Sequence, residues 1–339
     1  MPTDELPPQA YAAALAAVPS IRTQYLRTLL GTVPPCAAWA SVVAGGPWAA
    51  EARRVDVAAT WRAHRDAGVE VLVAGDGRYP RVLAGEPAAP AVLFALGDPR
   101  VADRHPRVAV VGTRSATRYG LGMAAQLGAE LAAAGVAVVS GLALGIDGAA
   151  HEGAVGAWRA AGGSAAPPVA VVPRALDEPY PRSHRRLWDR VASAGAVLSD
   201  APVGTDVPRW RFPHRNRIMA ALADVVVVVE CHATGGSLHT VRAAVRRGRS
   251  VGAVPGSVRS PASAGTNDLL ADGCFVVRDV TDVLVALGLA RAGAVPMRPR
   301  RRADREEPGG GVAVAAGEDD GCSNGGRDGA PGTAGNGHA

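Results

Sequence analysis

The densest group of side chains suited to binding chemistry lies between Pro208 and Arg217. This segment reads Pro-Arg-Trp-Arg-Phe-Pro-His-Arg-Asn-Arg, with four arginines, a Trp and a Phe and no acidic residue. Because a guanidinium group presents a planar fork of donors that fits phosphate oxygens, the segment suits an anionic ligand. The alternative interpretation is a solvated loop whose arginines cap helices or pair with neighbouring carboxylates. The residue types alone leave the two interpretations evenly balanced.

A glycine-rich turn from Val111 to Gly120 suits the same kind of ligand. It follows an apolar run and reads Val-Gly-Thr-Arg-Ser-Ala-Thr-Arg-Tyr-Gly. Where such a turn leads into a helix, free N–H groups and the positive end of the helix dipole favour a phosphate. Arg114 favours anion binding over simple helix capping by Ser115 or Thr117. The turn is not GxGxxG, and no acidic residue follows a second strand to hold a ribose, so dinucleotide binding has little support.

Two further glycine-rich turns lead into predicted helices. The first, from Ser140 to His151, places Asp147 and His151 four residues apart on one helix face. Such a pair could serve hydrolysis, but no nucleophile or metal-ligand set accompanies it. A structural role is therefore favoured, in which Asp147 caps the helix and His151 is satisfied by a neighbour. The other turn spans Glu230–Thr240. Because turns at the carboxyl ends of parallel strands share one crevice, the set predicts a site for an extended, phosphate-bearing ligand.

An alternation of strands and helices from residue 107 onward would position these turns. Apolar, β-branched runs separated by amphipathic stretches are typical of an α/β fold with a doubly wound, mainly parallel sheet. We expect strands at Arg107–Val111, Val136–Val139, Val169–Val172, Ala196–Leu198, Val225–Val229, Val251–Val254 and Phe275–Val277. We expect helices at Tyr119–Ala134, Gly148–Ala160, His184–Ala194, Arg215–Ala223, Ser237–Arg247, Thr266–Ala271 and Val280–Leu287.

Composition divides the chain into four predicted regions. Residues 1–9 are expected to be disordered, and residues 10–67 to form a small alanine-rich helical module of the SAM or helix-hairpin-helix kind. Residues 68–293 are expected to form the α/β domain. Residues 294–339 begin with a basic run and continue as a Gly/Asp-rich tail with too little apolar content to fold, and they carry no winged-helix pattern. The module's helices are expected at Tyr11–Val18, Ile21–Leu30, Trp48–Val57 and Val57–Arg65.

Charge and composition restrict the possible functions. The 339 residues carry a net charge of +5 and a pI near 9.4, which favours polyanionic partners. There is no lysine, so Schiff-base and P-loop lysine chemistry are excluded. The four cysteines are scattered and predict neither a zinc site nor a disulfide framework, which favours the cytoplasm. No apolar run approaches the ~20 residues that span a bilayer, and we expect no cofactor. Aromatic residues make up only 4%, so phosphate contacts should outweigh base stacking.

Seven ordered motifs resemble the DNA-processing protein A family, also called DprA or Smf. The motifs are V-G-T-R-S-A-T-x-Y-G, S-G-L-A-L-G-I-D-G-A-A-H, Y-P-R, F-P-x-R-N-R-I, G-G-S-L-x-T, V-P-G-S and G-T-N-x-L-L-x-D-G, in the family's order and spacing over residues 69–290. The resemblance implies an extended Rossmann-like fold and a homodimer. It also implies a protein that binds and protects incoming single-stranded DNA and loads RecA during natural transformation. It implies neither an enzyme nor a membrane protein.

The same resemblance assigns residues to the DNA pocket by position. They are Gly112, Thr113, Arg114, Ser115, Arg182, Phe212, Arg215, Asn216 and Arg217, with Gly236 and Ser237 closing the far side.

Two other classes of function remain open. The first is a Rossmann-type hydrolase of nucleotide N-glycosidic bonds, of the lysine-decarboxylase-like group. Those enzymes place a glutamate after a Pro-Gly-Gly-x-Gly-Thr turn, whereas here Val241 and Arg242 follow the corresponding turn. The second is a pure interaction protein, in which the sheet is a scaffold and a helical face binds a partner.

Overall fold

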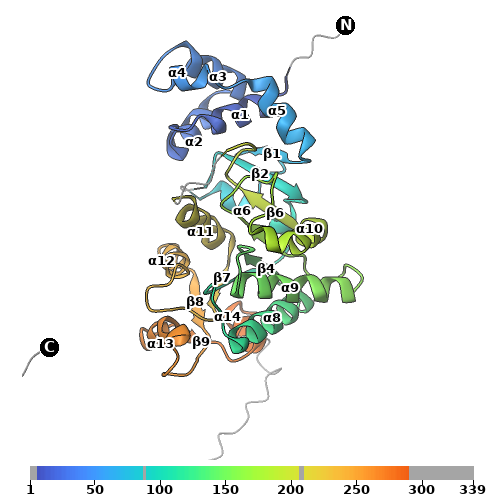
Figure 1. Cartoon of the computed structure of the whole chain (residues 1–339), viewed down its shortest axis with the longest axis vertical. Helices are drawn as coiled ribbons and strands as arrows, with labels where there is room; N and C mark the ends of the chain where they lie inside the picture. The colour runs from blue at the N-terminus through green and yellow to red at the C-terminus, as the bar shows by residue number, and fades with distance from the viewer. Residues whose placement is uncertain (1–5, 87–88, 206–209, 290–339) are drawn as a thin grey trace, which may run out of the picture. The chain divides into compact units, whose positions relative to one another are not determined.

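A computed structural model describes residues 6–86, 89–205 and 210–289 (Figure 1). Its N-terminal helices are α1 (Pro8–Ala17), α2 (Thr23–Thr32), α3 (Pro35–Ala44), α4 (Ala49–Ala52) and α5 (Val57–Asp66). Helix α1 begins at Pro8, so the expectation of disorder through residue 9 is wrong at its end. Helix α3 was not among the expected helices, since two consecutive prolines, Pro34 and Pro35, suggest a break. Pro35 instead occupies the first turn of α3, where a missing N–H costs no helical hydrogen bond. The 294–339 tail, Pro208 and Arg209 lie outside the described residues.

The described residues form a nine-stranded sheet in the order β1-β2-β6-β5-β4-β3-β7-β8-β9. The strands are β1 (Glu70–Val73), β2 (Val92–Gly97), β3 (Arg107–Val111), β4 (Ala137–Ser140), β5 (Val169–Val171), β6 (Ala196–Ser199), β7 (Val225–Val228), β8 (Ser250–Ala253) and β9 (Phe275–Val276). From β6 to β9 every neighbouring pair is parallel, while β2 pairs antiparallel with both β1 and β6. The prediction of a doubly wound, mainly parallel α/β sheet is confirmed, and each expected strand lies within one or two residues of its predicted ends.

Helices cover both faces of this sheet, which explains the runs of valine. The remaining helices are α6 (Arg81–Ala84), α7 (Val101–Arg104), α8 (Arg118–Ala133), α9 (Ile146–Ala160), α10 (Arg185–Ala194), α11 (Arg211–Leu222), α12 (Leu238–Val245), α13 (Ala264–Ala271) and α14 (Val280–Ala286). In β7, Val225 and Val227 pack in one cluster with α8, α9 and α14, whereas Val226 and Val228 pack in another with α11 and α12. A strand buried on both faces needs apolar residues at every position.

The sheet reverses its winding between β3 and β7. From β3 the chain adds β4, β5 and β6 in one direction, and it then returns to place β7 on the other side of β3. Val108 accordingly lies between Val138 of β4 and Val225 of β7. The loops that leave β3 and β7 lead to helices on opposite faces and therefore separate at the carboxyl edge of the sheet. This separation opens a crevice, the usual ligand position in open α/β sheets.

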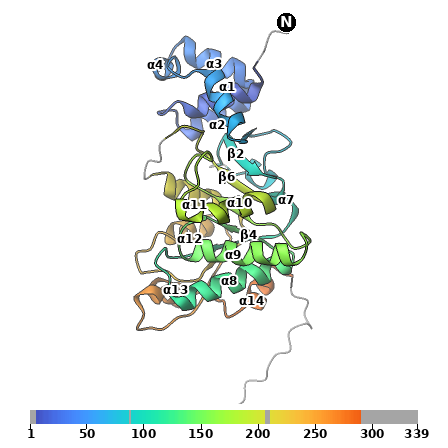
Figure 2. The ribbon, with the colours of Figure 1, turned by 45° about the vertical axis from the view of Figure 1, so that its right-hand side comes forward.

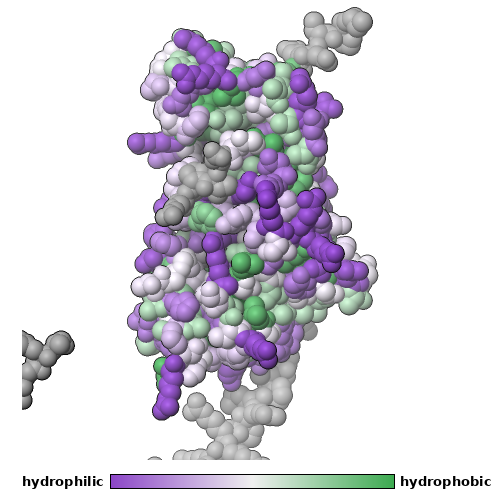
Figure 3. All heavy atoms as spheres, viewed as in Figure 1, coloured by the Kyte–Doolittle hydropathy of each residue, from purple (hydrophilic) through white to green (hydrophobic). Residues whose placement is uncertain are grey.

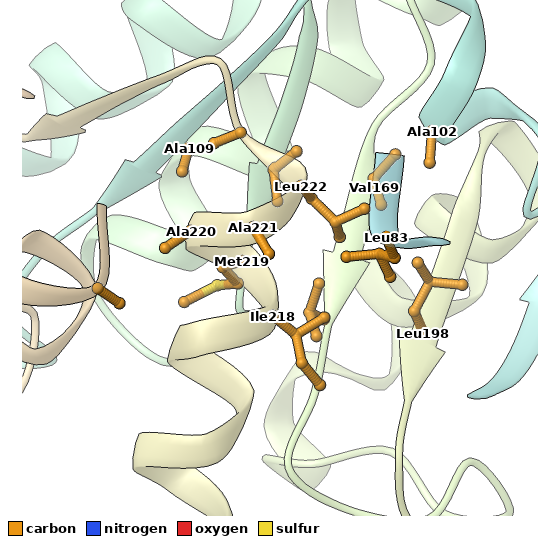
Figure 4. Close-up of a cluster of buried hydrophobic side chains, with 14 of the residues drawn as sticks. Leu83, Ala102, Ala109, Val169, Leu198, Ile218, Met219, Ala220, Ala221 and Leu222 are labelled. Carbon is orange, nitrogen blue, oxygen red and sulfur yellow. The ribbon is translucent and has the colours of Figure 1, made fainter. Parts of the chain in front are cut away.

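Helix α11 brings the arginine segment to this crevice. Its second half is anchored in the core, where Ile218, Met219 and Leu222 lie among strand residues such as Val169 and Leu198 (Figure 4). The helix begins at Arg211, four residues earlier than the predicted Arg215. Phe212 therefore projects from the same helix as Arg215 and Asn216 rather than from a preceding loop.

The N-terminal helices gather at the β1–β2 end of the sheet (Figures 1 and 2). Leu15 of α1 shares a buried cluster with Val71, Phe94 and Trp188. His64 of α5 is also buried; its Nδ1 lies 2.8 Å from the Thr60 carbonyl oxygen, and its Nε2 accepts the Val203 N–H at 3.0 Å. The helical region and the α/β region therefore share a core, and their boundary at residues 67–68 stays a prediction.

Hydrophilic residues are spread over the helical and central regions, and the apolar residues on the visible face form small separate patches (Figure 3). None of the described helices combines the length and apolar character that a membrane span requires.

Candidate nucleic-acid interface

A cavity of about 440 Å³ lies at the carboxyl edge of β3 and β7, where the sheet reverses. We call it the switch-point pocket. It is lined by Val111, Gly112, Thr113, Arg114, Ala143, Asp147, Phe212, Pro213, Arg215, Asn216, Met219, Gly235, Gly236, Ser237, His239 and Thr240. Eight of the eleven residues assigned from the sequence line it. The other three, Ser115, Arg182 and Arg217, are exposed and do not.

The buried carboxylate of Glu230 holds the first glycine-rich turn in place. Its two oxygens accept the Thr117 backbone N–H at 2.8 Å and the Thr117 hydroxyl at 2.6 Å. The Glu230 carbonyl oxygen accepts the Thr113 N–H at 2.8 Å. Thr117 in turn caps α8 by accepting the Gly120 N–H, so the capping interpretation holds for this residue. A Cβ at Gly120 would lie 2.2 Å from the Glu230 carboxylate, which explains the glycine at this position.

Arg215 forms the floor of the pocket. Only 5% of the residue is exposed, and its Nη1 donates to the carbonyl oxygens of Gly141 at 2.7 Å and Val171 at 2.8 Å. Its Nε donates to Asn216 Oδ1 at 3.0 Å. These bonds join α11 to the ends of β4 and β5. Arg215 is therefore not a freely exposed cation, because two of its three nitrogens are bound to protein oxygens.

Asp147 places a carboxylate beside this guanidinium. It is buried close to the backbone of Gly141, and the backbone of Gly141 and Gly112 stabilises its charged form. Burial raises the pKa of Asp147, while the nearby charges of Arg215 and Arg114 oppose that rise. The expectation that Asp147 caps its helix is wrong, because the cap position of α9 is Gly145 and no side chain caps it. The floor therefore carries one positive and one negative group.

His151 lies one helical turn beyond Asp147. It is completely buried, and burial lowers its pKa to about 4. The ring is therefore neutral at neutral pH. Neither ring nitrogen of His151 has a hydrogen-bond partner among the described residues, so the expectation that a neighbour satisfies it is wrong. His151 does not line the pocket, which still favours a structural role for the Asp147–His151 pair over a hydrolytic one.

The mouth of the pocket combines exposed cations with aromatic rings. The Arg114 guanidinium carbon lies 5.0 Å from the centre of the Phe212 ring, and Tyr180 meets Phe212 edge-on at 6.1 Å. Arg182 and Arg217 are also exposed but do not line the pocket: Arg182 pairs with Glu178, and Arg217 forms no ion pair among the described residues. An arginine beside an aromatic ring suits a nucleotide, because the ring stacks on the base and the guanidinium binds the phosphate.

Backbone donors converge on the pocket from both sides. Among the described residues, the N–H groups of Arg114, Gly236 and Ser237 make no hydrogen bond. Gly236 and Ser237 precede α12, so their N–H groups lie at a helix N-terminus. Asn216 Nδ2 donates to the Gly236 carbonyl oxygen at 3.3 Å and so joins α11 to this turn. The arrangement is chemically suited to a phosphate bound between two turns.

Sequence reasoning missed several lining residues. Met219 could have been found, because it stands four residues after Arg215 on one helix face. His239 and Thr240 belong to a turn that was recognised, but nothing in their types distinguished them. Asp147 was recognised and given a different role.

The extent and order of the motifs can now be compared with known proteins. A model of the family described as DNA recombination-mediator protein A matches residues 70–288. The chain belongs to this family. The resemblance deduced from the seven motifs is thereby confirmed, and residues 70–288 contain every strand of the sheet.

Individual relatives of the recombination-mediator family agree. A Mycobacterium tuberculosis relative that carries the DprA name is 46% identical over 200 residues, which are 59% of this chain and 50% of the relative. The Bacillus subtilis DNA processing protein DprA is 34% identical over 225 residues, 66% of this chain and 73% of that protein. This chain therefore spans about half the length of the mycobacterial relative.

Solved structures of the family share the fold. The Streptococcus pneumoniae DNA processing protein A superposes with a TM-score of 0.62 at 28% identity, covering 83% of this chain and 93% of that one. The Helicobacter pylori protein, whose structure concerns its single-stranded DNA binding mode, gives 0.57 at 27% identity, covering 65% and 95%.

Proposed function

We propose that the protein binds single-stranded DNA in the switch-point pocket. The observation that carries the proposal is the convergence of unpaired backbone N–H groups from two turns beside the Arg114–Phe212 pair. The single-stranded DNA binding of the Helicobacter pylori relative supports it. Since the chain is poor in aromatics, we expect the phosphates to supply most of the affinity, with Phe212 or Tyr180 stacking one or two bases.

The same proposal includes the partners that a recombination mediator needs. We infer a cytoplasmic homodimer that protects incoming strands and loads RecA onto them during natural transformation. The family description as a recombination mediator supports the inference. RecA filament formation on a strand coated with single-strand binding protein should accelerate when the protein is added. Sedimentation at several concentrations should give twice the mass of the chain.

A nucleotide hydrolase is a weaker candidate for the same pocket. Asp147 is the only carboxylate among the lining residues, and it is buried beside the Arg215 guanidinium. His239 is the only imidazole among the lining residues, and no exposed acid accompanies it there. We therefore propose that the protein has no catalytic residues and needs no cofactor or metal.

Fluorescence anisotropy tests the proposal directly. A labelled strand of about 30 nucleotides and its duplex are titrated with the protein at several salt concentrations. We expect tight binding to the single strand, weak binding to the duplex and a steep fall in affinity with salt. Equal affinity for the single strand and the duplex, or no binding at low salt, would contradict the proposal. Nucleotide hydrolysis would then be assayed.

A further inference from the structure

A second cavity lies on the opposite side of the first turn of α11. It has a volume of about 830 Å³ and opens between the α1–α2 connection and the start of α11. We call it the module cleft and define it by Ser20, Arg22, Thr23, Leu26, Trp210 and Arg211. None of these residues lines the switch-point pocket, and none belongs to the motifs that identify the family.

Trp210 is the most informative residue of the module cleft. It is 54% exposed, although exposing an indole ring to water is unfavourable. The Arg211 guanidinium carbon lies 4.9 Å from the ring centre on one side, and His214 meets the ring edge-on at 6.1 Å. A planar group can therefore stack on the remaining exposed surface of the ring. Nucleobases stack on such platforms without regard to sequence.

The charge of the module cleft also fits a nucleic-acid backbone. Its one lining carboxylate, Asp200, is buried, pairs with Arg211 at 3.3 Å and lies 2.8 Å from His214 Nδ1. Arg22 is exposed and forms no ion pair among the described residues. Because the acid is already paired while Arg22 is not, the cleft presents a positive charge beside an aromatic ring. This combination is typical of single-strand binding surfaces.

The two cavities are adjacent along the chain. Trp210 and Arg211 line the module cleft, and Phe212 and Pro213 line the switch-point pocket. The Cα atoms of Trp210 and Phe212 are two virtual bonds apart, at most about 7.6 Å. Residues two positions apart at a helix start point in different directions, so a strand leaving the pocket past Phe212 has to pass around the start of α11 to reach Trp210.

We propose that the module cleft is a second binding site for single-stranded nucleic acid, continuous with the switch-point pocket. Trp210 stacks a base, and Arg22 binds a phosphate of the same strand. The inference rests on the proposed function, since it extends the strand bound in the first pocket. It assigns the helical module a direct part in DNA binding.

Strands of two lengths test the inference. Oligothymidylates of about 4 and about 16 nucleotides are titrated against the full chain, with the fold of each variant checked by circular dichroism. We expect Trp210→Ala to weaken the long strand about tenfold and the short strand not at all, because only the long strand spans both sites. Trp210→Phe should retain most of the affinity. Arg22→Ala should flatten the salt dependence for the long strand only. Arg65→Ala removes an exposed arginine of the same module outside the cleft and should change nothing.

Each contrary result has a distinct meaning. An equal loss at both lengths would show that Trp210 only supports the start of α11, and the inference would fall. No loss of affinity at either length would mean that the cleft binds a protein partner or a second copy of the chain instead of the strand. That result would also overturn the inference. If Arg114→Ala weakens binding while Trp210→Ala does not, the proposed function stands and the second site fails. If the unaltered protein binds no single strand, the proposed function itself fails.

Photocrosslinking locates the strand without any substitution. A long strand carrying 5-iodouracil at one position at a time is irradiated with the unaltered protein, and crosslinked peptides are sequenced. We expect one set of positions to mark Phe212 and a second set, a few nucleotides away, to mark Trp210. Crosslinks confined to the switch-point pocket at every position would contradict the second site.

Discussion

The floor and the mouth of the switch-point pocket use the same side chain for different purposes. On the floor, Arg215 is buried, bonded to two carbonyl oxygens and balanced by Asp147. At the mouth, Arg114 is exposed and rests on an aromatic ring. The floor arginine therefore maintains the shape of the pocket, while the mouth arginine is available to a ligand. Changes at the floor should affect stability first, and changes at the mouth should affect binding alone.

The largest effect should follow from removing the floor cation. Arg215→Met leaves Asp147 buried without its compensating charge and leaves two carbonyl oxygens without a donor, so unfolding free energy should fall by about 3–5 kcal/mol. Urea denaturation measures this loss. Adding Asp147→Asn should recover part of it, because the uncompensated charge is removed. If the double variant is no more stable than the single one, the two residues are not electrostatically coupled as described.

A smaller loss should follow from crowding the floor. A Cβ at Gly141 would lie 1.7 Å from Arg215 Nη1 and 2.6 Å from Asp147 Oδ2. Gly141→Ala should therefore displace Arg215 and lower stability by about 1–3 kcal/mol, measured by thermal or urea unfolding.

Gly122 provides the matched control for this substitution. It lies on the exposed face of α8, and a Cβ there would meet nothing within 4 Å. Gly122→Ala should leave stability unchanged or raise it by up to about 1 kcal/mol. Equal losses at both glycines would show that the effect of Gly141→Ala does not arise from the pocket floor.

A change at the mouth should weaken DNA binding without lowering stability. Arg114→Ala should leave the unfolding free energy within about 0.5 kcal/mol, because the side chain is exposed. The Arg114→Ala protein should bind single strands of every sequence about tenfold more weakly. The slope of its salt dependence should fall by about 0.7, the value for one phosphate contact. Anisotropy at several salt concentrations measures both.

Arg246→Ala serves as the charge-matched control, since Arg246 is exposed at the far end of α12. It should change neither affinity nor slope appreciably. A change in sequence preference for Arg114→Ala with the slope intact would argue that Arg114 contacts a base rather than a phosphate.

The contrast between floor and mouth also shows which features of the structure could be predicted from the sequence. The strands were predictable because β7 and its neighbours are β-branched runs between glycine turns. The start of α11 was not predictable, because Pro213 suggests a loop. Pro213 instead lies in the first turn of the helix, where a backbone N–H would have no helical partner. The burial of Arg215 was hidden for another reason. Its partners Gly141 and Val171 lie 74 and 44 residues away and meet it only through the sheet.

Acidification should give the smallest effect: it should lower the stability of the fold while leaving the charge of Arg114 unchanged. Burial lowers the pKa of His151 to about 4, whereas the unfolded chain has a histidine pKa near 6.5. Between these values the unfolded state binds more protons, so stability is full above pH 6.5 and falls as the pH is lowered, by about 1.4 kcal/mol per unit at most. Burial also lowers the pKa of His64, which adds a second contribution of the same sign. Arginines do not titrate in this range, so Arg114 should keep its charge.

Urea denaturation from pH 7 to pH 5 measures this slope. His151→Leu should remove the larger part of it, and His232→Gln, at an exposed position, should not. Over the same range, the salt slope of DNA binding should stay constant while the protein remains folded. A salt slope that changed with pH in step with stability would mean that a group other than the arginines contributes to phosphate binding, so Arg114 would not account for it alone.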